Sequence, residues 1–146
     1  MPMITVRYTT PNPQSDLRPQ IAALASRLAA EKLGKQPEVT AVLVEYADPK
    51  GWFIAGQHPT EAGLAAFWLD IKVTDKTNTK TETTRFVEET FVEMEKLLGP
   101  LHTECYVLVH AVDGDAYGYG GLTQNGRRAA AHPAWPSADD VLLRQF

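Results

Sequence analysis

The stretch Ala41-Val42-Leu43-Val44 recurs 65 residues later as Tyr106-Val107-Leu108-Val109, and this recurrence decides the fold. The same offset relates further pairs without a gap: Gly34 and Gly99, Asp48 and Asp113, and Gly56 and Gly121. Two halves that share one pattern at one spacing predict two copies of a single structural unit.

Each half reads outward from this stretch as a strand, a helix, a second strand and a glycine-containing hairpin. The first strands of the two halves are Ile4-Thr5-Val6-Arg7 and Leu69-Asp70-Ile71-Lys72, again 65 residues apart. A strand, a helix and a strand of this length form a right-handed crossover with the two strands parallel. We therefore predict an α+β fold in which duplicated β-α-β units form a four-stranded mixed sheet with two helices on one face.

The first helix is predicted to begin near Ser15 or Asp16, either of which can cap it, with Pro19 in its first turn. It ends at Gly34. Its apolar residues recur at the three-and-four spacing of a helix that covers a sheet. They are Leu17, Ile21, Leu24, Ala25 and Leu28.

The second helix is predicted to begin near Thr81 or Thr83 and to stop at Gly99. Its apolar positions have the same spacing and indicate a second core-facing stripe. They are Phe86, Val87, Phe91, Met94, Leu97 and Leu98.

The second strands of both halves are apolar at consecutive positions, a pattern typical of strands buried on both faces. Two helices cover only one face of the sheet. Sister subunits in a symmetric homo-oligomer would cover the other face. The alternative is that the segment from about Leu122 folds back over it.

We expect a single domain over residues 1–146, with repeat units at about 2–57 and 67–122 and a C-terminal tail at 123–146. Within the tail, Ser137 and Asp140 form a pattern typical of a capping box, which predicts a short helix ending near Phe146. This helix would dock on its own or a neighbouring subunit. Disorder of the tail is the alternative.

The composition argues against several function classes. The net charge is −4 and the longest basic run is Arg127-Arg128, so we expect no nucleic-acid partner. No apolar run approaches membrane-spanning length and no secretion signal is evident, so we expect a cytoplasmic protein without a membrane partner. The single cysteine, Cys105, lies in an apolar run and is predicted to be a buried hydrophobe. The four histidines lack metal-ligand spacing, so no metal site is predicted.

Pro2 is the strongest candidate for chemistry. Removal of Met1 would leave Pro2 with a free secondary amine at the start of an apolar strand. An α-amino group titrates at roughly 7.7–8, and apolar burial or nearby cations lower its pKa toward working pH, where proton transfer is most efficient. The alternative is that Met-Pro is an ordinary chain start.

Three features taken together resemble the tautomerase superfamily: Pro2, the two strand-helix-strand units, and the paired hairpins Gly51-Trp52-Phe53-Ile54-Ala55-Gly56 and Ala116-Tyr117-Gly118-Tyr119-Gly120-Gly121. The resemblance is greatest to fused 4-oxalocrotonate tautomerase-like proteins and covers roughly residues 2–125. It implies a homotrimer in which the Pro2 amine acts as acid and base on a small enol, 2-oxo acid or unsaturated carboxylate, without a cofactor. Relatives use the same proline for hydration, dehalogenation or decarboxylation.

The resemblance also assigns candidate residues around the proline. The pocket-lining aromatic residue of the family's hairpin falls on Trp52 in the first unit and Tyr117 in the second, although either could pack at a subunit contact. The two arginines that hold substrate carboxylates in the family are absent. Ala41 stands where the strand arginine would fall, and the second unit offers Lys76 in the loop that matches the other.

Further cations could take the place of those arginines. Arg7 and Lys72 occupy equivalent strand positions, opposite in parity to the apolar residues beside them. They could contact a carboxylate substrate or form structural ion pairs with Asp70, Glu45 or Glu104. His110, at the end of the last apolar strand, could donate a proton or simply be a hydrogen-bonded histidine at the end of the sheet.

Two functions therefore remain open. The first is a tautomerase-like isomerase, or a related hydratase, dehalogenase or decarboxylase, that uses Pro2. The second is a catalytically silent tautomerase-like or ferredoxin-like binding or assembly module. Retention of Met1 would favour the second, because Pro2 would then be an amide without a basic nitrogen.

Overall fold

The computed structural model describes residues 2–131. By its internal contacts the chain divides into two compact units. Among the described residues, the first comprises residues 2–72 and 78–110, and the second comprises residues 73–77 and 111–131. The predicted helix at Ser137–Phe146 and its docking lie outside the described residues.

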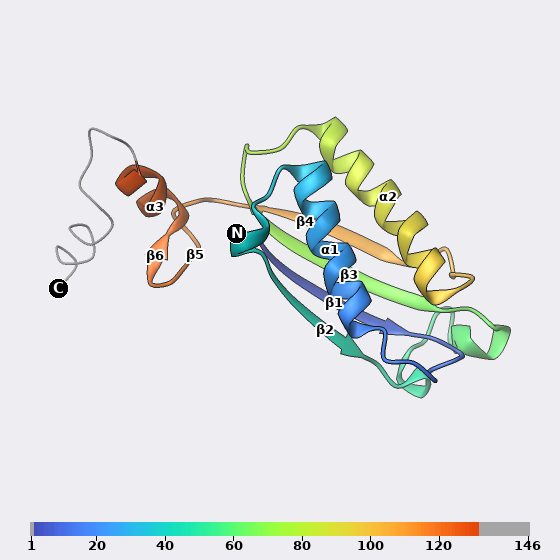
Figure 1. The fold of residues 1–146 in the computed structure, drawn as a ribbon. Helices are drawn as coiled ribbons and strands as arrows, with labels where there is room; N and C mark the ends of the chain where they lie inside the picture. Colours follow the sequence, from blue (N-terminus) through green and yellow to red (C-terminus); the bar gives the residue numbers. More distant parts are fainter. Residues whose placement is uncertain (1, 132–146) are drawn as a thin grey trace. The chain divides into compact units, whose positions relative to one another are not determined.

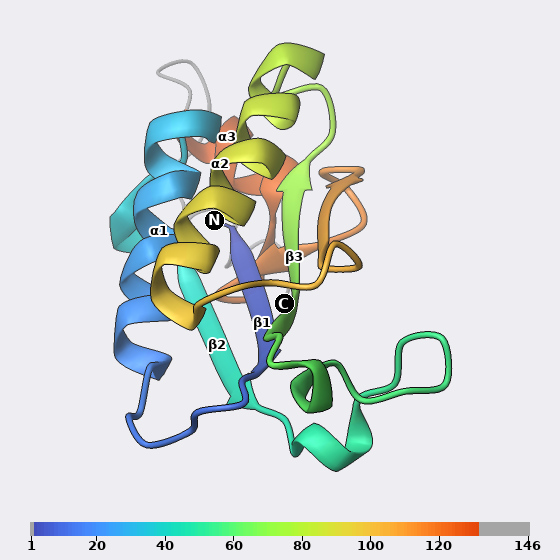
Figure 2. The same ribbon diagram turned by 90° about the vertical axis from the view of Figure 1, so that its right-hand side faces the viewer.

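A four-stranded sheet in the order β2-β1-β3-β4 is the centre of the fold (Figure 1). Its strands are β1 (Met3–Thr9), β2 (Ala41–Tyr46), β3 (Ala66–Thr74) and β4 (Tyr106–Val112). β1 runs parallel to β2 and antiparallel to β3, so the sheet is mixed. Helices α1 (Arg18–Leu33) and α2 (Lys80–Leu98) lie side by side on one face of this sheet (Figure 2). The predicted α+β fold of duplicated β-α-β units is confirmed.

The core lies between the helices and that face. Alternate residues of β1 and β3 are almost fully buried there, as expected for strands with one covered face. The helices contribute buried residues at the three-and-four spacing. The core-facing side chains include Ile4, Val6, Leu69, Ile71, Ile21, Leu28, Phe86 and Met94.

Both helices begin differently from the prediction. Helix α1 begins at Arg18 after Leu17, which gives no side-chain cap, although Asp16 accepts the Arg18 backbone N–H at 3.1 Å. Helix α2 begins one residue before Thr81, because Thr79 and Glu82 form a capping box with each other's backbone N–H groups. Both helices end at the predicted glycines, Gly34 and Gly99.

One burial prediction for α2 is wrong. Val87 of α2 is exposed, and Thr90 is buried instead, with its hydroxyl donating to the Phe86 carbonyl at 2.6 Å. The prediction for β2 and β4, burial on the second face by sister subunits, is not tested within one copy of the chain, where they are edge strands of the sheet with Leu43 47% and Leu108 37% accessible on the uncovered face. The apolar run alone did not reveal that these strands lie at the edges.

Each half ends in a two-residue turn, and the two turns are 65 residues apart. Ile54 and Gln57 exchange both backbone hydrogen bonds across Ala55 and Gly56, which have φ values of 52° and 75°. Tyr119 and Leu122 pair in the same way across Gly120 and Gly121, joining β5 (Gly118–Tyr119) to β6 (Leu122–Thr123). Positive φ at both central residues defines the type I′ hairpin turn.

The second unit also contains helix α3 (Gln124–Ala131), which the sequence reading did not predict. The missed signal is Thr123, whose hydroxyl accepts the Gly126 N–H at 2.9 Å, the geometry of a helix N-cap.

Candidate functional site

Pro2 directly precedes β1 and its side chain is almost fully buried. Its carbonyl accepts the backbone N–H of Ala41 at 3.0 Å, which extends the parallel β1–β2 ladder to the end of the sheet. The next residue, Met3, pairs with Ala41 on one side and Lys72 on the other. The backbone of Pro2 is therefore held to β2 by this hydrogen bond, and its neighbour Met3 lies between two strands.

Arg7 and Lys72 both lie on the sheet face away from the helices, as their parity predicted, and both form ion pairs. Arg7 Nε lies 3.4 Å from Glu45 Oε2 across the β1–β2 ladder. Lys72 Nζ pairs with Asp70 two residues earlier on β3. Lys72 is one register position from Pro2, whereas Arg7 is five residues along the strand, roughly 16 Å at the rise of a β-strand.

Trp52 is held in a short structured loop after β2. Asp48 accepts the Lys50 N–H at 3.0 Å and begins a 3-10 turn at Pro49–Gly51. His58 Nδ1 donates to the Trp52 carbonyl at 2.9 Å. The Phe53 ring packs against His58, with the ring centroids 4.6 Å apart.

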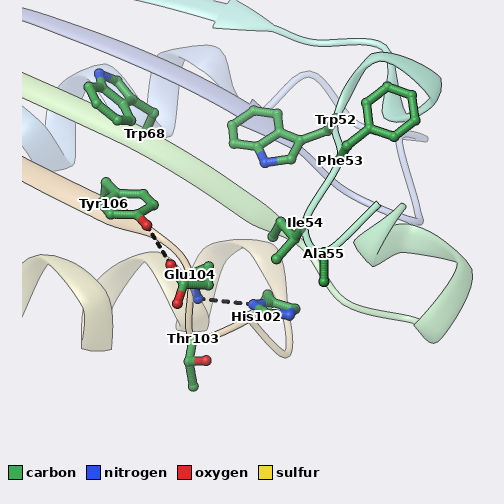
Figure 3. Close-up of a pocket in the computed structure, with 9 residues that line it drawn as sticks. All are labelled: Trp52, Phe53, Ile54, Ala55, Trp68, His102, Thr103, Glu104 and Tyr106. Carbon is green, nitrogen blue, oxygen red and sulfur yellow. Dashed lines mark hydrogen bonds between the residues drawn. The ribbon is translucent and has the colours of Figure 1, made fainter. Parts of the chain in front are cut away.

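Trp52 contributes to a cleft of about 740 Å³ within the first unit. Figure 3 shows Trp68 and Tyr106 on one side of the cleft, Trp52 on the other, and Glu104 between Tyr106 and His102. The complete lining is Trp52, Phe53, Ile54, Ala55, Trp68, His102, Thr103, Glu104 and Tyr106. Of these residues, sequence reasoning singled out only Trp52 as a candidate.

The cleft lies near the end of β1 that is far from Pro2. Trp68 of the cleft pairs with Arg7, and β1 extends about 23 Å over its seven residues. Within the first unit, Trp52 and Pro2 are thus at opposite ends of the sheet. Contact between this aromatic residue and a Pro2 amine would require a second copy of the chain.

The second unit positions Tyr117 and Lys76. The Tyr117 hydroxyl lies 2.9 Å from Thr74 Oγ1, and burial raises the pKa of this phenol. Lys76 is exposed in the turn after β3 with a positive φ of 63°. Arg127 stacks on the Tyr119 ring, with its guanidinium carbon 3.8 Å from the ring centroid.

The remaining sequence candidates are less constrained. His110 lies on β4 with an exposed side chain. Cys105 was predicted to be a buried hydrophobe but is only half-buried, and burial raises the pKa of its thiol, which disfavours the reactive thiolate. Across residues 2–131 no cluster of three metal-ligating side chains occurs, and no helix is long and apolar enough to cross a membrane.

The comparisons with known proteins agree with this architecture. No protein-family model matches the chain. A curated protein from Dickeya dadantii described as a probable tautomerase K2 is 30% identical over 61 residues, which are 42% of this chain and 91% of that protein.

Solved structures extend the likeness to most of the chain. A macrophage migration inhibitory factor-like protein from Entamoeba histolytica superimposes with a TM-score of 0.67 at 16% identity, covering 84% of this chain and 97% of its own. A fused 4-OT that forms an asymmetric trimer gives a TM-score of 0.66 at 14% identity over 88% and 99% of the two chains. The protein Pt0534, inactivated by 2-oxo-3-pentynoate, gives 0.72 at 13% identity over 84% and 96%.

The duplicated β-α-β fold, with a proline preceding its first strand, defines a protein of the tautomerase type. The chain belongs to the tautomerase superfamily. Its two fused units give it the architecture of the fused 4-OT proteins.

Proposed function

We propose that this protein is an isomerase in which the Pro2 amine, freed by removal of Met1, transfers a proton between oxygen and carbon of a small enol or 2-oxo acid. The amine accepts the proton of the enol hydroxyl and returns it to carbon, so the reaction needs no cofactor and no net proton. The observation that carries the proposal is the position of Pro2 at the buried start of β1 in a tautomerase fold.

The position of Pro2 suits this role physically. Desolvation disfavours the charged form of an amine and lowers its pKa from the ordinary value of roughly 7.7–8. A base that titrates near neutral pH is largely unprotonated and still basic enough to accept a proton. Fixation of the Pro2 carbonyl by Ala41 also limits the orientations open to the ring nitrogen.

The substrate's carboxylate would be bound by Lys72, the cation of the first unit nearest Pro2 in register. Its present partner is Asp70, so substrate would compete with an internal carboxylate. A lysine offers a point charge rather than the bidentate fork of an arginine, which favours a small acid held by one contact over a diacid held by two.

We further propose a cytoplasmic homotrimer in which the Trp52 hairpin of one copy covers Pro2 of another. Two similar solved structures with fused units are trimers. The separation of Trp52 from Pro2 along β1 is consistent with a site that a second subunit completes. Lys76, Tyr117, Arg7 and His110 are secondary candidates for substrate contact.

The proposal is tested by blocking the amine without changing a side chain. A variant with one residue inserted between Met1 and Pro2, so that a peptide bond to Pro2 is retained, should lose ketonisation of a 2-oxo acid enol, followed by ultraviolet absorbance. Pro2→Ala should lower kcat/KM by about 100-fold or more. Intact mass establishes whether Met1 is absent from the parent protein. Equal rates for the parent and the blocked variant would refute the role of Pro2.

Covalent labelling provides a second readout. The acid 2-oxo-3-pentynoate has an activated triple bond to which a neutral secondary amine can add, and it inactivates the neighbour Pt0534. We expect a single adduct on the parent protein at Pro2 and none on the variant whose amine is blocked.

A catalytically silent assembly module is the second candidate. The observation that favours it is that Arg7 and Lys72 are each already paired with a carboxylate and no arginine stands at position 41. Retention of Met1 together with inertness toward the enol substrate and 2-oxo-3-pentynoate would establish this alternative.

A further inference from the structure

The cleft of the first unit contains two exposed aromatic side chains, Trp68 and Tyr106, that the proposed function does not use. Trp68 is 38% and Tyr106 52% accessible, although large aromatic side chains are normally buried. At the 65-residue offset Trp68 corresponds to Met3 and Tyr106 corresponds to Ala41, so this aromatic pair occurs in the second half alone. An exposed aromatic cluster in a concave site is a feature of ligand binding.

The two rings form a tilted corner. Their centroids are 5.6 Å apart and their planes differ by 41°. A group at the mouth of this corner can therefore lie within about 6 Å of both centroids, the distance at which a cation is attracted to an aromatic face. Trp52 faces the corner from the other side of the cleft (Figure 3).

Hydrogen bonds hold this arrangement in place. Trp68 Nε1 donates to Asp70 Oδ2 at 3.3 Å, and the Tyr106 hydroxyl donates to Glu104 Oε2. The bond to this carboxylate raises the pKa of Tyr106, which therefore stays neutral. His102 Nδ1 accepts the Glu104 backbone N–H at 2.9 Å, which places the proton of a neutral imidazole on Nε2.

The charge of the cleft is negative. Glu104 is the one lining residue with a carboxylate. One of its two oxygens accepts a hydrogen bond from the neutral Tyr106 hydroxyl, which leaves the negative charge unbalanced. The nearest cation in register is Arg7, opposite Trp68, and its charge is balanced by Glu45. Lys72 is balanced by Asp70. A carboxylate ligand would be repelled here, whereas a cation would gain from both Glu104 and the ring faces.

We propose that this cleft binds a small organic ammonium ion, with the cationic nitrogen over the Trp68 and Tyr106 rings and beside Glu104. The cleft is thus a second site on the chain. It selects the charge opposite to that of the acid proposed for Pro2.

The test is an isothermal titration of the full-length protein with three probes of nearly equal shape. Choline carries the cation, 3,3-dimethylbutan-1-ol replaces its nitrogen by carbon, and 3,3-dimethylbutanoate carries a negative charge. We expect saturable binding of choline, binding of the alcohol at least about tenfold weaker, and no binding of the acid. Equal affinities for choline and the alcohol would overturn the proposal. An absence of saturable choline binding would also overturn it, and this is the result expected if another copy of the chain fills the cleft.

Variants locate the site. Glu104→Gln should weaken choline binding several-fold while keeping the size of the side chain, and Trp68→Leu should weaken it by about tenfold or more. Glu88→Gln removes an equal charge from the exposed face of α2 and should leave the affinity unchanged. Circular dichroism checks that each variant is folded. If Trp68→Leu fails to fold, Trp68→Phe keeps a smaller ring and should show an intermediate loss. Unchanged affinity in a folded Glu104→Gln variant would contradict the assigned site.

Discussion

Pro2, just before β1, and Phe67, the second residue of β3, are 65 residues apart and occupy equivalent positions in the two halves, where both are almost fully buried. Pro2 can carry a free amine, because it becomes the first residue when Met1 is removed. Phe67 is an amide within β3 and has no ionisable nitrogen. Joining two units in one chain therefore leaves one copy able to use backbone amine chemistry, and the other copy free to fill the same position with a core side chain.

The largest loss of stability is expected when the Phe67 side chain, which stands at the position equivalent to Pro2, is removed. Phe67→Ala deletes a fully buried ring and should destabilise the protein by about 3–5 kcal/mol. Urea unfolding followed by tryptophan fluorescence measures the loss. Phe53→Ala, at a ring that is 62% exposed, is the matched control and should cost less than about 1 kcal/mol. Similar costs at both positions would show that Phe67 is not a core residue.

The paired hairpin turns give the next largest effect. Gly56 has a φ of 75° with open space around an added Cβ, so Gly56→Ala introduces backbone strain alone and should cost about 1–2 kcal/mol. Ala55, at a φ of 52°, stands where the second half has Gly120. Ala55→Gly should therefore leave stability unchanged or raise it by up to about 1 kcal/mol. Thermal unfolding of both variants tests the sign of each change in stability. A stabilising Gly56→Ala would contradict the turn geometry.

The helix starts differ between the halves as well. Thr79→Ala removes the side-chain cap of α2 and should cost about 1 kcal/mol. Ser15→Ala should change stability by less than about 0.5 kcal/mol, because the structure assigns Ser15 no part in capping α1. Chemical unfolding of the two variants compares them directly, and a larger effect at Ser15 would favour the start expected from the sequence.

The capping box also predicts a dependence on pH. Hydrogen bonds from Thr79 lower the pKa of Glu82 below its ordinary value. A carboxyl with a lowered folded-state pKa contributes stability above its unfolded pKa, near 4.3, and loses it as the pH falls through the folded value. The stability difference between the parent protein and Glu82→Gln should thus be present at pH 7 and shrink below about pH 4. A stability difference that does not vary between pH 7 and pH 3 would refute this contribution of the Glu82 carboxylate.

The smallest effect is expected at the equivalent cations of the two first strands. Arg7→Gln removes an ion pair whose partners are both about half exposed, so unfolding of the dissociated chain should change by less than about 1 kcal/mol. Lys72→Gln should cost more stability than Arg7→Gln, because its partner Asp70 is only 14% exposed. In the enol assay, however, it should raise KM if Lys72 binds the acid. Unchanged KM would remove Lys72 from the substrate site.

Much of the fold could be predicted from local patterns. The 65-residue offset is a repeat visible in the linear sequence. The apolar stripe around Ile21 and Leu28 and the stops at Gly34 and Gly99 depend on residues only a few positions apart. Alternation along β1 likewise predicted that Ile4 and Arg7 lie on opposite faces. The start of α2 was placed too late because two residues, Thr79 and Glu82, had to be recognised as one reciprocal cap.

The sequence by itself determined the duplication, the strand and helix order, and the proline before the first strand, because repeats, periodicity and chain position are properties of a linear pattern. Only the tertiary structure decided which strands lie at the sheet edges, that Arg7 and Lys72 are already paired, and that Trp52 is remote from Pro2 but shares a cleft with Trp68, Tyr106 and Glu104. These facts depend on the register between strands and on loops that bring distant residues together, and neither is encoded in the spacing of residues along the chain.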